Sequence, residues 1–134
     1  MIIFDVDNFK NINDSYGHNR GDKVLQEISK IVTSTLRESD HVGRWGGEEF
    51  VVISTESSLE QTAIVAEKIR QSICSYDFKE LGSVSCSFGV AQYATGDSYQ
   101  SIIHKADTAL YEAKNRGKNR VILFDEKLQQ SSLS

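Results

Sequence analysis

The chain has 134 residues, of which 39% are hydrophobic and 25% are charged, and its formal net charge is −4. This is typical of one soluble domain, large enough to bury roughly two-thirds of its unfolded surface. No apolar run approaches the ~20 residues of a membrane span, and the acidic balance argues against nucleic acid as the main partner.

The two cysteines, Cys74 and Cys86, form neither a disulfide framework nor a zinc spacing, so we expect free thiols in a reducing cytoplasm. Met1 leads directly into an apolar strand and an acidic segment, without the pattern of a signal peptide. A buried strand at the first residue indicates that the sequence is a piece of a longer protein.

The first half of the chain predicts a strand at residues 1–6, a short helix at 7–18, a longer helix at 19–38 and a hairpin at 42–54. Gly17 separates the two helices, and the second helix carries apolar residues at helical spacing. Gly46 and Gly47 lie between apolar strand segments, which predicts a tight hairpin turn because glycine adopts positive φ at little cost.

The second half predicts a helix opened by Ser58 and Gln61, a turn at 79–82, a strand at 83–93, a helix at 98–116 and a strand at 121–124. Ser58 and Gln61 have the spacing of a capping box. This order of elements predicts an α/β or α+β sheet with helices packed on it. We expect residues 1–126 to form the domain and residues 127–134 to be a flexible tail.

The hairpin presents two consecutive carboxylates, Glu48 and Glu49, after its glycines. Successive strand side chains point to opposite faces, so we expect the two to have different roles. If the first strand is the neighbour of the hairpin, Asp5 and Glu48 face one another. With a backbone carbonyl they form the oxygen site that Mg²⁺ prefers. The alternatives are a solvated acidic tip, and helix caps at Asp5 and Asp7.

A phosphate site is expected where the first strand meets the first helix. Asn8, Phe9 and Lys10 form the first helical turn, whose free N–H groups attract phosphate, and Lys10 adds a positive charge. Further along, Asn13 and Asp22 have the donor and acceptor groups that read a guanine edge. In isolation, Asn13 is an ordinary polar helix residue and Asp22 an ordinary acid of an N-terminal turn.

The sequence resembles the GGDEF domain, the catalytic domain of diguanylate cyclases. Matching segments follow in family order across nearly the whole chain: Phe4–Lys10, Ile12–Asp14, Tyr16–His18, Gly21–Asp22, Arg44–Phe50, Ser87–Ala91, Ala106–Lys114 and Gly117–Arg120. The signature has Glu48 where many members have aspartate. The family's usual helix and loop before the first strand lie outside this sequence, as do sensor and dimerising domains.

The resemblance implies a central, mostly antiparallel sheet flanked by helices, like the ferredoxin-like palm of polymerases and nucleotidyl cyclases. It implies a cytoplasmic domain, attached to a membrane only through other domains. It also implies a reaction in which two GTP give cyclic di-GMP and two pyrophosphates, between two protomers of a homodimer.

The resemblance also implies a role for each site residue. Asp5, the Val6 carbonyl and Glu48 would hold Mg²⁺, with Mn²⁺ as an alternative. Glu48 would be the base for the 3′-hydroxyl, and Lys10 would stabilise the transition state. The substrate-binding residues would be Asn8, Phe9, Asn13, His18, Asp22, Lys114 and Lys118. Lys118 replaces the arginine common in the family, which keeps the charge but loses the bidentate fork.

Arg37 and Asp40 form an R-x-x-D pattern that ends five residues before the first glycine of the signature. In the family this spacing is typical of an inhibitory site for the product, to which Lys68 would add a cation. As a bare pattern it is also a common end for a helix. A second function therefore stays open: a module that binds cyclic di-GMP without turnover.

Several other residues are expected to be structural. We expect Trp45, Phe50 and Phe88 to pack in the core or the turn, and Tyr111 to pack on its helix. His41 and His104 have no ligand partner at metal spacing, and Asp107 is interpreted as a structural acid.

Overall fold

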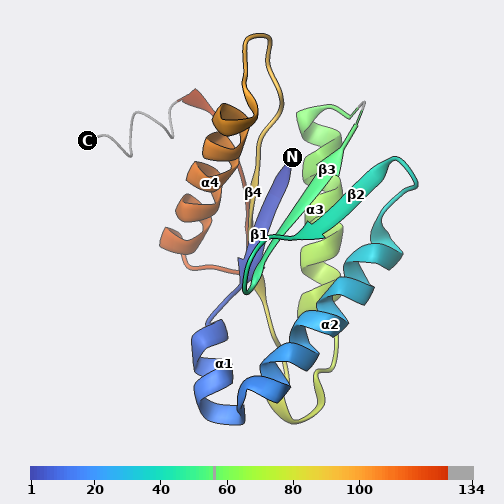
Figure 1. Cartoon of the computed structure of the whole chain (residues 1–134), viewed down its shortest axis with the longest axis vertical. Coiled ribbons are helices and arrows are strands. Elements are labelled where there is room, and N and C mark those ends of the chain that lie inside the picture. Colours follow the sequence, from blue (N-terminus) through green and yellow to red (C-terminus); the bar gives the residue numbers. More distant parts are fainter. Residues whose placement is uncertain (56, 127–134) are drawn as a thin grey trace.

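The computed structural model describes residues 1–55 and 57–126, and within them a five-stranded sheet is flanked by helices (Figure 1). The elements in chain order are β1 (Ile2–Val6), α1 (Phe9–Tyr16), α2 (His18–Thr35), β2 (Asp40–Arg44), β3 (Glu49–Ser54), α3 (Leu59–Ser75), a 3₁₀ turn (Lys79–Leu81), β4 (Cys86–Val90), α4 (Tyr99–Asn115) and β5 (Val121–Leu123). The tail expected at residues 127–134 lies outside the described residues.

The sheet has the strand order β2-β3-β1-β4-β5, so the first strand lies at its centre. β1 is antiparallel to both β3 and β4, β2 is antiparallel to β3, and only the β4–β5 pair is parallel. The register sets Asp5 opposite Glu49, which brings the hairpin beside the end of β1. The predicted α+β fold with a mostly antiparallel sheet is confirmed.

Alternating residues of β1 pack on opposite faces of the sheet. Phe4 stacks between Phe50 and Phe88, with ring centroids 5.0 and 4.6 Å apart, in the core under α2 and α3. Ile3 belongs to the second core, which α4 covers on the other face (Figure 1). Asp5 follows two residues after Ile3 and therefore lies on the α4 side.

Gly89 allows α4 to approach β4 closely. A Cβ atom at this position would lie 2.1 Å from the carbonyl oxygen of Ala106 and 2.4 Å from the backbone nitrogen of Leu110. Both are backbone atoms of α4, so any larger residue would push the helix away from the sheet. This packing fixes the position of Lys114, one turn beyond Leu110.

The capping box predicted at Ser58 and Gln61 is confirmed at the start of α3. The strand expected at residues 83–93 is shorter, covering only Cys86–Val90. Glu48 lies in the hairpin turn, because β3 begins one residue later at Glu49. Within the described ranges, no helix combines the length and the apolar character needed to cross a membrane.

Two aromatic predictions are wrong. Trp45 is 49% exposed in the hairpin turn, and Tyr111 is 62% exposed on the outer face of α4. The strand alternation that buries Phe50 does not extend to Trp45, which lies outside β2 and β3. The core prediction for Phe50 and Phe88 is confirmed, since both are buried.

Candidate active site

An ion pair between β1 and α4 marks the candidate site. Lys114, in the last turn of α4, donates from Nζ to Oδ2 of Asp5 at 2.5 Å. Asp5 is buried, and its other oxygen, Oδ1, has no hydrogen-bond partner. A buried carboxylate oxygen without a partner is costly in a folded protein, so this atom is a point where a ligand would be stabilised.

The Asp5 carboxylate lies in an acidic environment. Burial raises the pKa of Asp5, the carboxylates of Asp7 and Glu48 raise it further, and the Lys114 ammonium opposes them. The register of Asp5 opposite Glu49 places Glu48, one residue earlier in the hairpin turn, near the end of β1. Both groups supply hard oxygen ligands, and one or two carboxylates with substrate phosphates are the usual environment of Mg²⁺ in proteins.

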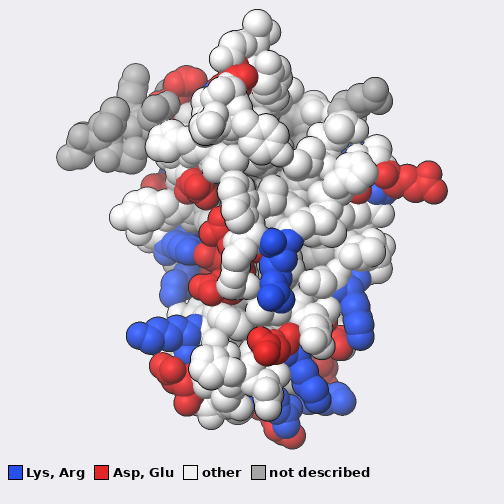
Figure 2. Space-filling view, in the orientation of Figure 1, with Lys and Arg blue, Asp and Glu red and all other residues white. Residues whose placement is uncertain are grey.

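Two further acids add to the negative charge. Burial, Asp107 and Asp5 raise the pKa of Glu49, and burial raises the pKa of Asp107 on α4. Figure 2 shows acidic side chains gathered in the middle of this face, with basic side chains on either side. Such a field favours a divalent cation and disfavours an anion that arrives without one.

Asp7 has a different role from the one expected of a helix cap. Its carboxylate accepts hydrogen bonds from Ser85 Oγ at 2.7 Å, Ser87 Oγ at 2.6 Å and the Asn119 N–H at 3.0 Å. The residue at the cap of α1 is Asn8, and its side chain makes no cap hydrogen bond. Asp7 therefore joins the end of β1 to β4 and to the segment before β5, and the cap interpretation is wrong for it.

The start of α1 carries the expected phosphate-binding groups. Asn8 has a left-handed backbone with φ 57°, Phe9 begins the helix and is buried, and Lys10 is exposed. Lys118 reaches across from the segment before β5 and donates from Nζ to the Asn8 Oδ1 at 2.7 Å. Free N–H groups and two lysines thus lie at one corner, beside the end of β1.

The predicted guanine residues lie on α1 and α2. Asp22 and His18 are exposed near the start of α2, while the Oδ1 atom of Asn13 is buried without a hydrogen-bond partner. Gly21 makes room for this amide, because a Cβ there would lie 1.9 Å from Asn13 Oδ1 and 3.1 Å from Phe9 Cζ. The amide is therefore held at the α1–α2 corner with a free acceptor.

The R-x-x-D residues form a local ion pair at the other end of the hairpin strand. Asp40 Oδ2 accepts from the Arg37 backbone N–H at 3.0 Å and from Nε at 3.4 Å, and Arg37 Nη2 donates to Ser57 Oγ at 2.8 Å. Asp40 begins β2 and the turn follows Arg44, which separates the pair from the turn by roughly 13 Å. Lys68 is exposed on α3.

Sequence reasoning missed the residues that hold the segment before β5. Asn119 bonds Asp7, and Arg70 of α3 donates from Nη1 to Asn119 Oδ1 at 3.0 Å. Arg70 and Asn119 are 49 residues apart, so no local pattern predicts their contact. The one available signal is Gly117-Lys118-Asn119 after a helix, since asparagine tolerates the left-handed conformation.

Two cavities among the described residues lie away from this corner. They measure about 630 and 340 Å³, and both include Met1, at the opposite end of β1 from the acidic cluster. The residues that line these cavities do not include the acids and lysines of the candidate site.

Comparison with known proteins identifies the family. The family model described as "Diguanylate cyclase, GGDEF domain" matches residues 1–120. Diguanylate cyclase A of Treponema denticola is 43% identical over 136 residues, which covers 98% of this chain and 36% of the relative. Diguanylate cyclase DosC of Escherichia coli is 41% identical over 132 residues, covering 96% of this chain and 29% of the relative. The chain thus spans about a third of the length of these curated relatives.

A solved structure with a similar fold is described as the active GGEEF domain of a diguanylate cyclase from Vibrio cholerae. Its TM-score is 0.89 at 36% identity, with 93% of this chain and 81% of that chain covered. The expected resemblance is confirmed by sequence and by fold. The family model covers residues 1–120, including the double-glycine turn and the consecutive acids Glu48 and Glu49, so the chain belongs to the GGDEF domain family of diguanylate cyclases.

Proposed function

We propose that the chain is a catalytic domain that condenses two GTP into cyclic di-GMP and two pyrophosphates, with each of two protomers presenting one GTP. The observation that carries the proposal is the buried Asp5 oxygen without a hydrogen-bond partner, on a strand that pairs with the hairpin carrying Glu48. The names of the similar proteins support the reaction.

The proposed cofactor is Mg²⁺, with Mn²⁺ as an alternative, held by Asp5, the Val6 carbonyl and Glu48. The ion would supply neutralisation of phosphate charge and polarisation of the reacting phosphoryl group. Lys114, which pairs with Asp5 in this structure, is free to turn toward the terminal phosphates because its side chain is 41% exposed.

In the proposed reaction, the 3′-oxygen of one nucleotide forms a bond to the α-phosphorus of the other. Glu48 accepts the proton of the 3′-hydroxyl, and the bond from the α-phosphorus to its bridging oxygen breaks, releasing pyrophosphate. The 3′-oxygen of the second nucleotide then attacks the α-phosphorus of the first in the same way, which closes the ring and releases the second pyrophosphate. Lys10 offsets the charge that develops on the phosphoryl oxygens, while Lys114 and Lys118 bind the leaving group.

Recognition of guanine is assigned to Asn13 and Asp22, with His18 beside them. The unpartnered Asn13 Oδ1 supports this assignment, because an acceptor held without a partner is satisfied when a base N–H approaches. Asn8 and Phe9 contribute their backbone N–H groups to the phosphates.

Assembly of two protomers is proposed because the reaction joins two GTP, and a second protomer would bring the second GTP. We further propose that cyclic di-GMP inhibits the enzyme at Arg37 and Asp40, with Lys68 as an additional cation. The existing ion pair supports this, since it orients the guanidinium before any ligand binds. The domain is proposed to act in the cytoplasm.

The second candidate is a module that binds cyclic di-GMP through Arg37 and Asp40 without turnover. The structure of a relative, the GGDEF domain of DgcB from Caulobacter crescentus, is described as a complex with c-di-GMP. The two candidates differ in the use of Glu48 and the double-glycine turn, which a binding module does not require.

The test is product analysis. A dimeric sample freed of bound nucleotide is incubated with GTP and Mg²⁺, and the products are separated by chromatography. We expect cyclic di-GMP and two pyrophosphates for each molecule formed. A dimeric sample that binds cyclic di-GMP but yields no product supports the binding module and overturns the enzyme.

A further inference from the structure

Three residues of the candidate site share a backbone conformation that residues other than glycine rarely adopt. Asn8 has φ 57°, Lys118 has φ 66° and Asn119 has φ 48°. The fourth described non-glycine residue with positive φ, Lys79, lies in the 3₁₀ turn. Such conformations cost little for asparagine and more for lysine, and they gather at functional sites.

The contacts of these residues join two distant segments. Lys118 Nζ donates to Asn8 Oδ1, and the Asn119 N–H donates to the Asp7 carboxylate. The two bonds fasten the segment before β5 to the start of α1. Each uses a group that its own left-handed residue directs toward the other segment, so the two turns stabilise one another.

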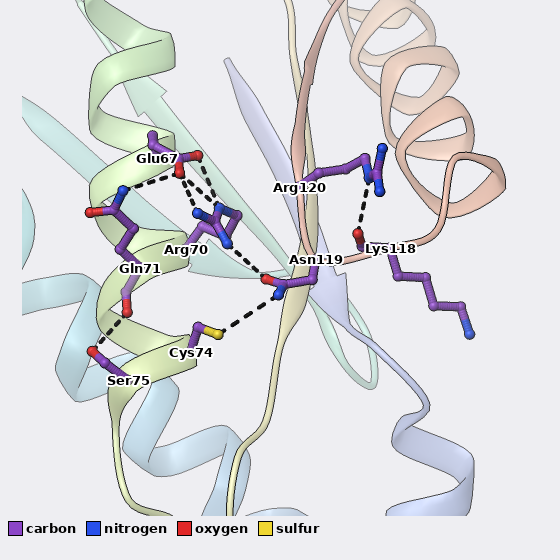
Figure 3. A network of polar contacts seen from close by, with 8 residues as sticks. All are labelled: Glu67, Arg70, Gln71, Cys74, Ser75, Lys118, Asn119 and Arg120. Atoms are coloured by element: carbon purple, nitrogen blue, oxygen red, sulfur yellow. Dashed lines mark hydrogen bonds and ion pairs between the residues drawn. The ribbon is translucent and has the colours of Figure 1, made fainter.

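A third contact comes from α3. Arg70 binds both oxygens of Glu67 through Nε, at 2.9 and 3.0 Å, and its Nη1 donates to Asn119 Oδ1 at 3.0 Å (Figure 3). The Asn119 amide nitrogen lies 3.7 Å from the Cys74 sulfur. The Arg70 side chain is only 20% exposed. The Asn119 side chain points toward Arg70, while the Lys118 side chain points away from it (Figure 3).

We propose that Arg70 is a positioning residue for the nucleotide site and acts through Asn119 on Lys118. By holding the Asn119 amide, Arg70 fixes the turn that directs Lys118 toward the start of α1. Glu67 in turn fixes the guanidinium. The inference rests on the function proposed above, in which Lys118 binds terminal phosphates.

The chemistry of arginine explains why this residue type is needed. Its planar fork binds a carboxylate with one edge and a side-chain amide with the other, so one side chain locks both partners. A lysine at position 118 has four rotatable bonds and no fork, so it gains more from a rigid backbone than an arginine would. Holding it in place before binding reduces the entropy lost when phosphate arrives.

The alternative is that Arg70 only anchors β5, whose neighbour Arg120 accepts a hydrogen bond from the Phe88 N–H. If Arg70 is only structural, its removal would weaken the binding of every ligand by the same factor. If Arg70 positions Lys118, its removal would weaken the binding of ligands with terminal phosphates and leave the binding of other ligands unchanged. The two readings therefore differ in the ratio of affinities for GTP and GMP.

The experiment measures the dissociation constants of GTP and GMP for the wild-type chain and for Arg70→Ala. The matched control is Gln71→Ala, because Gln71 lies on the same helix and donates to Glu67 at 3.3 Å. In Arg70→Ala we expect GTP affinity to fall about tenfold, the order of one lost charge-assisted contact. GMP affinity should change less than about twofold, within the spread of a surface substitution, and the control should match the wild type.

Two further variants test whether Arg70 acts through Asn119 and Lys118. Arg70→Ala made in a Lys118→Ala background should cause no further loss of GTP affinity, because the two residues act in one chain of contacts. If Arg70→Ala does not fold, Asn119→Gly cuts the same link while glycine keeps the left-handed turn, and it should give the same selective loss. Equal losses for GTP and GMP, or additive losses in the double variant, would overturn the positioning role.

Amide hydrogen exchange separates this inference from the function on which it rests. Exchange of the Asn119 N–H should become faster in Arg70→Ala and stay unchanged in Gln71→Ala, with no nucleotide present. Unchanged protection in Arg70→Ala overturns the inference while leaving the cyclase proposal intact. A wild-type chain that binds no GTP overturns both, even if the exchange result shows that Arg70 holds the turn.

Discussion

Lys114 donates to one oxygen of Asp5 at 2.5 Å, while the other oxygen of the same carboxylate is buried without a partner. One oxygen of the Asp5 carboxylate therefore accepts a hydrogen bond from lysine, and the other oxygen is available to a ligand. Under the proposed function, binding of a nucleotide with its metal ion would draw Lys114 from Asp5 toward the phosphates. In the structure without a ligand, the ion pair partly offsets the cost of burying the Asp5 carboxylate.

Replacement of Lys114 by methionine should destabilise the folded chain by about 1–3 kcal/mol, the usual cost of leaving a buried polar group unpaired. Asp5→Asn combined with Lys114→Met should recover part of that loss, because no buried charge remains. Urea unfolding measures both. Lys30→Met is the control, since the Lys30 side chain is 76% exposed. Equal costs for Lys114→Met and Lys30→Met would contradict the pairing.

Glu48→Gln should reduce formation of cyclic di-GMP by about 10²–10⁴-fold, the usual contribution of a general base. GTP binding should be largely retained, because glutamine has nearly the same shape and the phosphate-binding lysines are unchanged. Turnover and equilibrium binding are measured on the same samples. Glu60→Gln, an exposed acid of α3, serves as the control. Normal turnover in Glu48→Gln would remove this residue from its proposed role.

Gly21→Ala should weaken GTP binding about tenfold, because the new methyl group displaces Asn13 and with it a hydrogen bond to the base. The overpacking should also destabilise the fold by about 1–3 kcal/mol. Gly43→Ala is a matched control, since a Cβ there meets nothing within 4 Å. Binding of GTP is compared with binding of inorganic pyrophosphate, which lacks the base and should be unaffected. Equal weakening of both ligands would show a general collapse of the corner.

Arg37→Ala should remove inhibition by cyclic di-GMP and leave the initial rate within about twofold, because the residue lies at the end of β2 far from the turn. Rates are measured with and without added product. Ser57→Ala, which removes one hydrogen bond from Arg37, should weaken inhibition to a smaller degree. Undiminished inhibition in Arg37→Ala would place the product site elsewhere.

Stability should depend on pH through Asp40. Burial alone would raise its pKa, but the Arg37 backbone N–H, the Ser54 hydroxyl and the Arg37 side chain together more than compensate, so the pKa lies below the usual value of 3.8. A carboxylate with a lower pKa in the folded state contributes stability above pH 3.8, and this contribution is lost as pH falls through the folded value. The difference in unfolding free energy between wild type and Asp40→Asn should therefore shrink below that pH. A difference that stays constant down to pH 2 would contradict the shift.

Local patterns predicted the elements well because their signals lie within a few residues. The capping box at Ser58, the apolar stripe of α2 and the glycine pair of the hairpin each depend on neighbours in sequence. The aromatic core was likewise predictable, since Phe50 and Phe88 occupy the alternating positions of strands. The packing prediction for Trp45 was wrong because a turn residue does not follow the alternation of a strand.

The contacts of the candidate site residues were less predictable than the elements. Asp7 resembled a helix cap, but three donors from β4 and the β5 segment occupy it. Lys114 was assigned to phosphate from the family resemblance, and its pairing with Asp5 had no sequence signal. Contacts such as Arg70–Asn119 depend on the packing of α3 beside β5, which spacing in the sequence does not encode.

The hydrogen bond from Asn119 to Asp7 spans 112 residues. During synthesis, Asn119 leaves the ribosome long after Asp7. Because closing so long a loop is rewarded only when both ends are present, this corner assembles last. A chain cut short before Asn119 therefore carries the double-glycine signature without the hydrogen bond that joins the start of α1 to the segment before β5.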